Sequence, residues 1–315
     1  IQQIADSTIN GRDLVITNDF NLGGDTLFMP IESKIIFKGG KIVNGYISGN
    51  ETVHESQLVQ CYDDILLIGD WRNDISYVEY FVSDLTDSIE NFTSILNALV
   101  LADKVKLLAK TYKISTIVNN RVRVVNEDVI IEGMGVDYTK VILQKKHEND
   151  GANSAGYFMA DNEYPNGQNI DFKGITFSTD DYENNIINTL TSGYFLARAK
   201  YTTIGQSLVT PNISFINLKD CVFNGEIKFD YVSNTANQSF EEYVTRGIKS
   251  IKIDNIKTDQ TTVFFNVSNT IYKAVTVSNS EIKNIRSAWF FSPVASLPEP
   301  YQSAAYNEKK QFDFF

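Results

Sequence analysis

The chain has 315 residues, of which 39 are acidic and 28 basic, giving a formal net charge of −11. This acidic excess argues against a nucleic-acid partner, because phosphate backbones bind to basic surfaces. No apolar run approaches roughly 18 residues, so we predict no membrane insertion. The two cysteines, Cys61 and Cys221, are too few and too far apart for a disulfide framework or a metal site. We therefore expect two buried thiols, no metal and no cofactor.

A five-residue phrase recurs along the chain: two apolar residues two apart, then Gly or Asn two further on. It occurs at Leu14-x-Ile16-x-Asn18, Ile35-x-Phe37-x-Gly39, Ile65-x-Leu67-x-Gly69, Val129-x-Ile131-x-Gly133, Ile170-x-Phe172-x-Gly174, Ile213-x-Phe215-x-Asn217, Ile251-x-Ile253-x-Asn255 and Val275-x-Val277-x-Asn279. The alternation predicts a short strand with one buried face, and Gly or Asn permits a turn at positive φ. Such short strands bury their apolar faces only by stacking on one another.

The spacing of the phrase predicts an all-β fold, a right-handed parallel β-helix. Successive Gly or Asn positions lie 21, 30, 64, 41, 43, 38 and 24 residues apart. The shortest intervals match one coil of roughly 20 to 25 residues, and the longer ones indicate coils with lateral insertions. We expect large insertions after Gly133, Gly174 and Asn217, where any receptor or glycan contact would lie. A β-sandwich is the alternative, but it needs hairpin turns between most strands. Only four Asn-Gly pairs offer such turns.

Residues 88–100 break the strand pattern and predict one short α-helix. Apolar residues at 89, 92, 95, 96 and 99 lie on one helical face, and Asp87 with Glu90 forms a capping-box pattern. A solenoid exposes apolar surface at its ends, so we expect this helix to cap the strands from Lys104 onward. We predict three regions: a small module at 1–80, a helix-capped main body at 81–292, and an irregular segment at 293–315 that leads to a further domain.

Several segments resemble known β-helix proteins. The helix, Thr111-Tyr-Lys-Ile and the run from Val129 to Leu143 resemble the entry of pectate-lyase-like right-handed β-helices. The run from Ile36 to Thr52, followed by Glu79-Tyr80-Phe81, resembles the small β-helix module of tail fibres and tailspikes of phages that infect Bacteroides-type gut bacteria.

This resemblance implies a structural component of a phage tail that adsorbs to host surface glycan. The implied assembly is a homotrimer that contacts other tail proteins and host polysaccharide in the extracellular virion. The resemblance leaves two alternatives open. One is a polysaccharide depolymerase, either a lyase or a glycoside hydrolase, on the same scaffold. The other is a bacterial surface or secreted β-helix protein.

The enzyme alternative has four candidate catalytic residues. Pectinase-type hydrolases carry N-x-D, D-D, G-H-G and R-x-K motifs, and this chain has Asp180-Asp181 and Arg198-Ala199-Lys200. Neither His54 nor His147 lies between glycines, so the third motif is missing. The polar run around Asp180 is also typical of a solvated turn. A lyase would need carboxylates dense enough to bind calcium, and the sequence has no such cluster. We therefore favour a protein without catalytic residues.

Carbohydrate binding without catalysis requires aromatic and polar groups on an exposed face. The candidates are Tyr164, Tyr182, Tyr194 and Tyr201, which lie in or beside the insertions, and stacking in the core competes for the same rings. Asn217, Asn255 and Asn279 also form a regular series. We interpret them as turn residues that bond to neighbouring turns, because stacked Asn side chains commonly do so.

Overall fold

The structure, a computed structural model, describes residues 13–82, 88–114, 122–124, 128–143, 158–160, 168–184, 193–196, 213–225, 227–232, 248–259, 263–268, 272–283, 287–292 and 312–314. The chain divides into two compact units, Ile1–Leu107 and Leu108–Phe315. The predicted boundaries at residues 80 and 292 remain predictions. No helix among the described residues is both long and apolar enough to span a membrane.

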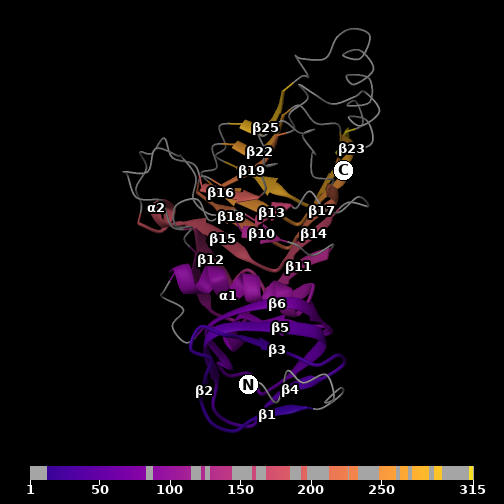
Figure 1. Cartoon of the computed structure of the whole chain (residues 1–315). Helices are drawn as coiled ribbons and strands as arrows, with labels where there is room; N and C mark the ends of the chain where they lie inside the picture. Colours follow the sequence, from indigo (N-terminus) through magenta and orange to yellow (C-terminus); the bar gives the residue numbers. More distant parts are fainter. Residues whose placement is uncertain are drawn as a thin grey trace, which may run out of the picture. The chain divides into compact units, whose positions relative to one another are not determined.

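The first unit is built around one long, curved strand. Its elements are β1 (Leu14–Ile16), β2 (Phe20–Asn21), β3 (Thr26–Phe28), β4 (Lys34–Phe37), β5 (Ile42–Glu55), β6 (Tyr62–Trp71), β7 (Ser76–Tyr77), the 3-10 helix η2 (Val78–Tyr80), α1 (Ser88–Leu101) and β8 (Lys104–Lys106). One edge of β5 pairs in turn with β2, β3 and β4, and its other edge pairs with β6. Figure 1 shows β5 and β6 as long curved ribbons that run side by side. All these pairings are parallel.

Ion pairs on the surface of the first unit reveal its repeat length. Lys34 pairs with Glu55, Lys41 with Asp63 and Arg72 with Glu51, across separations of 21, 22 and 21 residues. Exposed pairs of this kind add little stability, about 0–1 kcal/mol each. Their regular separation nevertheless falls within the predicted repeat of roughly 20 to 25 residues.

The predicted helix is confirmed as α1, which packs on β6 within the first unit. Ile95 and Leu99 are buried as the helical spacing predicts, and Ala98, which was not predicted, is buried beside them. The helix contacts β6, β7, β8 and η2. Contact with β8 agrees with the expected cover of Lys104, whereas cover of the preceding strand β6 was not predicted. The side chains of the predicted capping box lie outside the described residues.

The side chain of Asn97 in α1 forms hydrogen bonds with the backbone of β6. Its side-chain Nδ2 donates to the Ile65 carbonyl at 2.7 Å, and its Oδ1 accepts from the Leu67 N–H at 3.0 Å. These are the two backbone groups that a neighbouring strand would bond, so the amide of Asn97 takes the place of a peptide group. Asn97 is buried, so water cannot substitute for it.

The described part of the second unit consists of many short strands and one short helix. Its described elements are β9 (Thr111–Ile114), β10 (Val122–Val124), β11 (Asp128–Glu132), β12 (Lys140–Leu143), β13 (Phe158–Ala160), β14 (Gln168–Lys173), β15 (Thr176–Thr179), α2 (Asp180–Glu183), β16 (Gly193–Leu196), β17 (Ile213–Lys219), β18 (Val222–Asn224), β19 (Ile227–Val232), β20 (Ile248–Asp254), β21 (Lys257–Asp259), β22 (Val263–Ser268), β23 (Tyr272–Ser278), β24 (Glu281–Ile282), β25 (Ser287–Ser292) and β26 (Phe312–Phe314).

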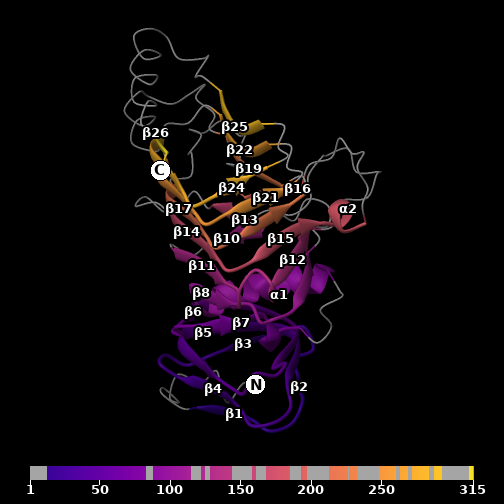
Figure 2. The same ribbon diagram turned by 180° about the vertical axis from the view of Figure 1, so that it is seen from behind.

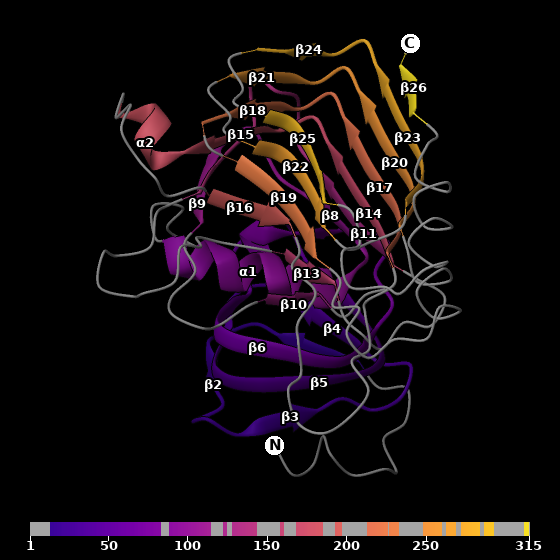
Figure 3. The ribbon, with the colours of Figure 1, turned by 90° about the horizontal axis from the view of Figure 1, so that it is seen from above.

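Every third strand of the second unit joins the same sheet. One sheet contains β11, β14, β17, β20, β23 and β26, a second contains β9, β12, β15, β18, β21 and β24, and a third contains β10, β13, β16, β19, β22 and β25. Figure 3 shows β14, β17, β20 and β23 side by side in this order. Every described strand pair with a defined register is parallel, so an antiparallel sandwich is wrong for this part of the chain.

The core of the second unit is aromatic and continuous from strand to strand. Phe177 of β15 and Phe223 of β18 are register partners, and their rings stack with centroids 5.2 Å apart and planes 16° apart. Phe172 meets Phe177 edge-on at 5.9 Å. Cys61 and Cys221 are buried free thiols, as predicted, and burial raises the pKa of Cys221 to about 12.

Left-handed residues at the ends of β14, β17, β20 and β23 form a row, with Gly174, Asp220, Asn255 and Asn279 at φ of 68°, 51°, 51° and 50°. The Asn255 N–H donates to the Ser278 carbonyl at 3.1 Å, and its Nδ2 donates to Asp220 Oδ1 at 2.8 Å. The predicted turn role of Asn255 and Asn279 is confirmed.

The prediction for Asn217 is wrong. It lies inside β17, and Asp220 occupies the turn instead. The buried pair that precedes this turn is Ile216 and Leu218, three residues beyond the predicted Ile213 and Phe215. The pairing of β14 with β17 shifts register between Gln168 and Asn169. Because side chains alternate every residue, such a shift reverses which residues face inward.

Candidate functional site

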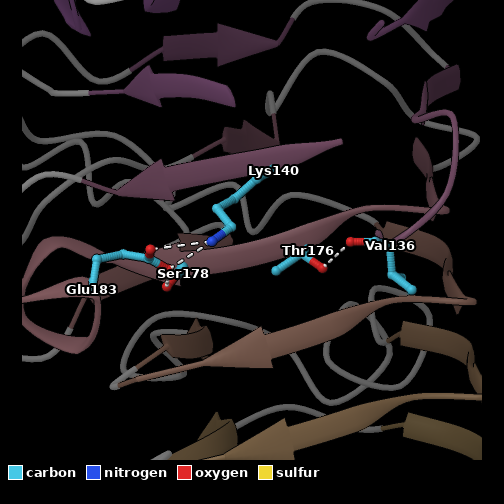
Figure 4. A network of polar contacts seen from close by, with 5 residues as sticks. All are labelled: Val136, Lys140, Thr176, Ser178 and Glu183. Carbon is cyan, nitrogen blue, oxygen red and sulfur yellow. Dashed lines mark hydrogen bonds and ion pairs between the residues drawn. The ribbon is translucent and has the colours of Figure 1, made fainter. Parts of the chain in front are cut away.

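A polar network lies on the second unit where α2 follows β15. Glu183, the last residue of α2, accepts hydrogen bonds from Ser178 Oγ at 2.6 Å and from Lys140 Nζ, which is 3.1 Å from both carboxylate oxygens. Figure 4 shows the side chains of Lys140 and Ser178 directed toward Glu183. Figure 2 shows α2 at the end of β15, so the helix returns Glu183 to the outward face of the strand from which it starts.

The register of β12 and β15 positions this network. Lys140 pairs with Thr176, and Ile142 pairs with Ser178, so Lys140 and Ser178 lie on the same face two residues apart. The Thr176 side chain does not join the network, because its Oγ1 donates to the Val136 carbonyl at 2.7 Å (Figure 4).

Tyr182 extends the network toward β21. Its hydroxyl donates to Asp259 Oδ2 at 3.2 Å. Desolvation, followed by the charge of Asp259, raises the pKa of Tyr182, so the phenol stays protonated as the donor of this bond. Tyr182 was a predicted glycan-binding residue. Its ring is half-buried and its hydroxyl is engaged within the protein.

The charge of Glu183 is stabilised within the network. Partial burial raises the pKa of its carboxyl, but the hydrogen bonds from Ser178 and Lys140, together with the Lys140 charge, outweigh burial and lower the pKa overall. A glycosidase general acid requires the opposite shift, because it must hold a proton near neutral pH. The network therefore holds the end of α2 against β12 and β15 through an ion pair and a hydrogen bond.

The structure leaves the other predicted site residues largely undescribed. Asp180 and Asp181 begin α2, but their side chains lie outside the described residues. Tyr194 lies in β16 of a different sheet from β15, and its side chain is also outside them. The remaining candidates, Arg198, Lys200, Tyr164 and Tyr201, fall entirely outside the described ranges. The catalytic and aromatic predictions for these residues stay predictions.

A second feature of this unit is the outward face of the sheet that contains β14, β17, β20 and β23, called here the polar face. Its first register row holds Asp171, Asn217, Lys252 and Thr276, and its second holds Lys173, Lys219, Asp254 and Ser278. All eight side chains are polar, and all are half-buried or exposed. Neighbouring strands are about 4.8 Å apart, so each row presents one polar group at that interval.

Hydrogen bonds order several side chains of the polar face. Asn217 Nδ2 donates to Asp171 Oδ2 at 3.1 Å. Asp254 Oδ1 accepts from Asn279 Nδ2 at 3.0 Å and from Ser278 Oγ at 2.9 Å, and these bonds lower the pKa of Asp254. Lys252 is exposed and makes no ion pair with any residue the structure describes. The face thus combines fixed acceptors with an unpaired cation.

A third cluster, in the first unit, has the connectivity of a catalytic triad. Ser56 Oγ lies 2.7 Å from His54 Nε2, and Tyr62 Oη lies 2.9 Å from His54 Nδ1. Tyr62 is fully buried, and within the described chain its hydroxyl reaches no other hydrogen-bond acceptor. A buried hydroxyl donates its proton, so we assign Nδ1 as the acceptor and place the imidazole proton on Nε2.

This tautomer makes His54 a donor to Ser56, whereas a general base would have to accept the serine proton. Burial also lowers the pKa of His54 to about 3, which makes the imidazole a weak base. Phe37, Tyr62 and Tyr80 surround its ring at centroid distances of 5.4, 5.4 and 4.4 Å. The cluster is a buried structural element.

No group of three or more His, Cys, Asp or Glu side chains within the described ranges is arranged to hold a metal ion. Sequence reasoning missed the polar face, although its signal was present. The outward positions of three strands, Asp171-x-Lys173, Asn217-x-Lys219 and Lys252-x-Asp254, alternate with apolar residues. The predicted phrase in β17 lay three residues too early, so Asn217 was assigned to a turn instead of to this outward face.

Comparison with protein-family models, with curated proteins and with solved structures finds no match for this chain.

Proposed function

We propose that this protein is a non-enzymatic, glycan-binding parallel β-solenoid that serves as a structural component of a phage tail. In this role it adsorbs to a host surface glycan as part of the virion. A homotrimer and contacts with other tail proteins belong to the same proposal. The phage assignment rests on the sequence resemblance of the run from Ile36 to Thr52 to tail-fibre modules.

Two features support the solenoid. Strands recur in each sheet of the second unit with a period of three, as expected of a chain that adds one strand to each of three sheets per coil. Left-handed residues also align from strand to strand at one corner, where each coil would turn. A right-handed course is expected, because connections between parallel strands are right-handed in about 98% of cases.

The polar face is the observation that carries glycan binding. It offers carboxylates, amides, hydroxyls and ammonium groups in two straight rows, which matches the donors and acceptors of a polyhydroxylated chain. Hydrogen bonds preorganise Asp171, Asn217 and Asp254, so less conformational entropy is lost when a ligand binds.

The shifted carboxylates favour binding over cleavage. Hydrogen bonds from Asn279 and Ser278 lower the pKa of Asp254, and contacts with Ser178 and Lys140 lower that of Glu183, so both groups are ionised at neutral pH. Glycoside hydrolysis needs one protonated carboxylic acid as well as a second, ionised carboxylate. Asp254, which lies on the polar face, is suited to accepting hydrogen bonds from sugar hydroxyls.

The test uses surface polysaccharides purified from candidate host strains and immobilised on a sensor. We expect Lys252→Gln to weaken binding about tenfold, as for a lost charge-assisted hydrogen bond of about 1.5 kcal/mol. Lys257→Gln is the matched control, because Lys257 is also exposed but lies on β21 of a different sheet. Equal effects of the two substitutions, or no binding by the wild type, would overturn the assignment of the polar face.

Incubation with the same polysaccharides also separates binding from cleavage. Reducing ends report hydrolysis, and ultraviolet absorbance reports the unsaturated products of a lyase. We expect neither signal to increase over a heat-inactivated control. Reproducible cleavage would favour the depolymerase alternative. Light scattering tests the oligomer, and a monomer at micromolar concentration would count against the tail-fibre proposal.

A further inference from the structure

The first unit contains a pocket of about 610 Å³. Its lining includes Phe37 at the end of β4 and residues of three connections: Asp19 of the β1–β2 loop, Lys38 and Lys41 of the β4–β5 turn, and Val59 and Gln60 of the β5–β6 loop. The volume lies within the range of about 300 to 1,000 Å³ that is typical of small-molecule sites. The pocket lies wholly within this unit and shares no residue with the polar face.

Gln60 points to a ligand in this pocket. Its side-chain Nε2 is buried, and within the described chain it has no hydrogen-bond partner. A buried amide without a partner destabilises the folded protein, and proteins rarely retain one without a role. Gln60 lines the pocket but its Nε2 is enclosed, so the terminal amide must rotate to present this donor to a molecule bound there.

The charges around the pocket are balanced. Lys41 forms an ion pair with Asp63, and the Lys41 N–H donates to Asp19 Oδ1 at 3.0 Å. Asp63 lies outside the lining but neutralises Lys41, which leaves Lys38 and Asp19 as one cation and one carboxylate on the pocket wall. This balance disfavours a strongly charged ligand and suits one that both donates and accepts hydrogen bonds.

Backbone geometry and an apolar wall shape the pocket. Gly40 has a φ of 65°, and a Cβ atom there would lie 2.2 Å from the Asn18 carbonyl carbon, so only glycine lets the β4–β5 turn approach so closely. This turn places Lys38 and Lys41 on its two sides. Val59 is 52% exposed and, with Phe37, provides apolar surface beside the polar groups.

We propose that this pocket binds a neutral saccharide unit, a hexose or N-acetylhexosamine. A pyranose ring presents hydroxyls that donate and accept at its rim and an apolar C–H face. The hydroxyls suit the polar lining residues Gln57, Gln60, Lys38 and Asp19, and the C–H face suits Val59. The balanced charge favours a neutral sugar over a uronic acid.

The experiment titrates the full chain with glucose, galactose, mannose, N-acetylglucosamine and glucuronate, followed by saturation-transfer NMR and calorimetry. We expect at least one neutral sugar to bind in the millimolar range. Gln60→Leu should weaken that binding at least about tenfold, because the donor is lost. The same substitution should leave the melting temperature unchanged or raise it, because it removes a buried amide that has no partner.

Two control variants make the outcome specific. Tyr46→Ser removes an exposed aromatic ring outside the pocket, and Lys252→Gln alters only the polar face of the second unit, so both should retain monosaccharide binding. The proposal is overturned if no neutral sugar binds, if Gln60→Leu binds as the wild type does, or if glucuronate binds more tightly than every neutral sugar. Loss of polysaccharide binding in Lys252→Gln with intact sugar binding would separate this pocket from the polar face.

Discussion

Replacing Asn97 by alanine should destabilise the first unit, because it removes two buried hydrogen bonds at once. The Leu67 N–H and the Ile65 carbonyl would lose their partners at positions that are almost fully buried. Each unsatisfied buried backbone group costs about 1–3 kcal/mol, so the expected loss is about 2–6 kcal/mol. The better helix propensity of alanine offsets less than about 1 kcal/mol of this.

Urea unfolding followed by circular dichroism measures the loss, and hydrogen exchange at the Leu67 amide locates it. Asn73→Ala is an informative comparison. Asn73 makes the same two kinds of bond with the backbone of His54, at 2.9 and 2.8 Å, but in a part-buried place that water can reach. We expect a loss of about 1–2 kcal/mol there.

Asn18→Ala is the negative control, because the side chain of Asn18 is exposed. Its effect should stay within about 0.5 kcal/mol. The reasoning is refuted if Asn97→Ala and Asn18→Ala change stability equally, or if the Leu67 amide remains as protected as in the wild type. Either result would mean that the Asn97 amide does not replace a strand at the edge of β6.

Three further predictions concern stability. Burial lowers the pKa of His54 from 6.5 to about 3, so between these pH values only the unfolded chain binds the proton. The free energy of unfolding should therefore fall by about 2 kcal/mol from neutral pH to pH 5. His54→Phe should flatten this part of the pH profile measured by urea unfolding, and an unchanged slope would contradict the assignment. Asn255→Val should lower the free energy of unfolding by about 1–3 kcal/mol, because a β-branched residue is strained at positive φ. Asn255→Gly should lower it by less than about 1 kcal/mol. Equal shifts in melting temperature for the two variants would count against this explanation. Phe177→Ala should cost about 3–5 kcal/mol through the cavity left in the aromatic stack. Phe28→Ala, at a site 57% exposed, should cost about 0.5 kcal/mol or less, and similar melting temperatures would refute the stacked core.

The misassignment of β17 shows where local sequence patterns fail. Ile213-x-Phe215-x-Asn217 fits the repeated phrase as well as the other copies do, yet Ile216 and Leu218 are the buried residues. Two overlapping alternations were possible, and the pairing of β17 with β14 selected one of them. That choice depends on a strand more than 40 residues away, so no local window contained it.

The candidate site was predictable only in part. The sequence suggested Asp180 and Asp181, in the short polar run after β15, as candidate catalytic residues. The described contacts instead involve Ser178, Tyr182 and Glu183. Lys140 completes the network although it lies 43 residues from Glu183. Parallel pairing of β12 with β15 brings the two together, and sequence spacing alone carries no sign of it.

The sequence by itself predicted a helix at residues 88–100 and several of the short strands, because each depends on the periodicity of a few adjacent residues. Repetition of the five-residue phrase along the chain predicted that the strands stack in parallel. Only the tertiary structure decided which side chains close strand edges and which polar groups meet. Asn97 substitutes for a strand beside β6, and the pocket at Gln60 gathers three loops. Both features combine residues that are far apart in the sequence. The backbone groups of β6 that need a hydrogen-bond partner, and the residues that line the pocket, can be identified only when the strands are placed side by side.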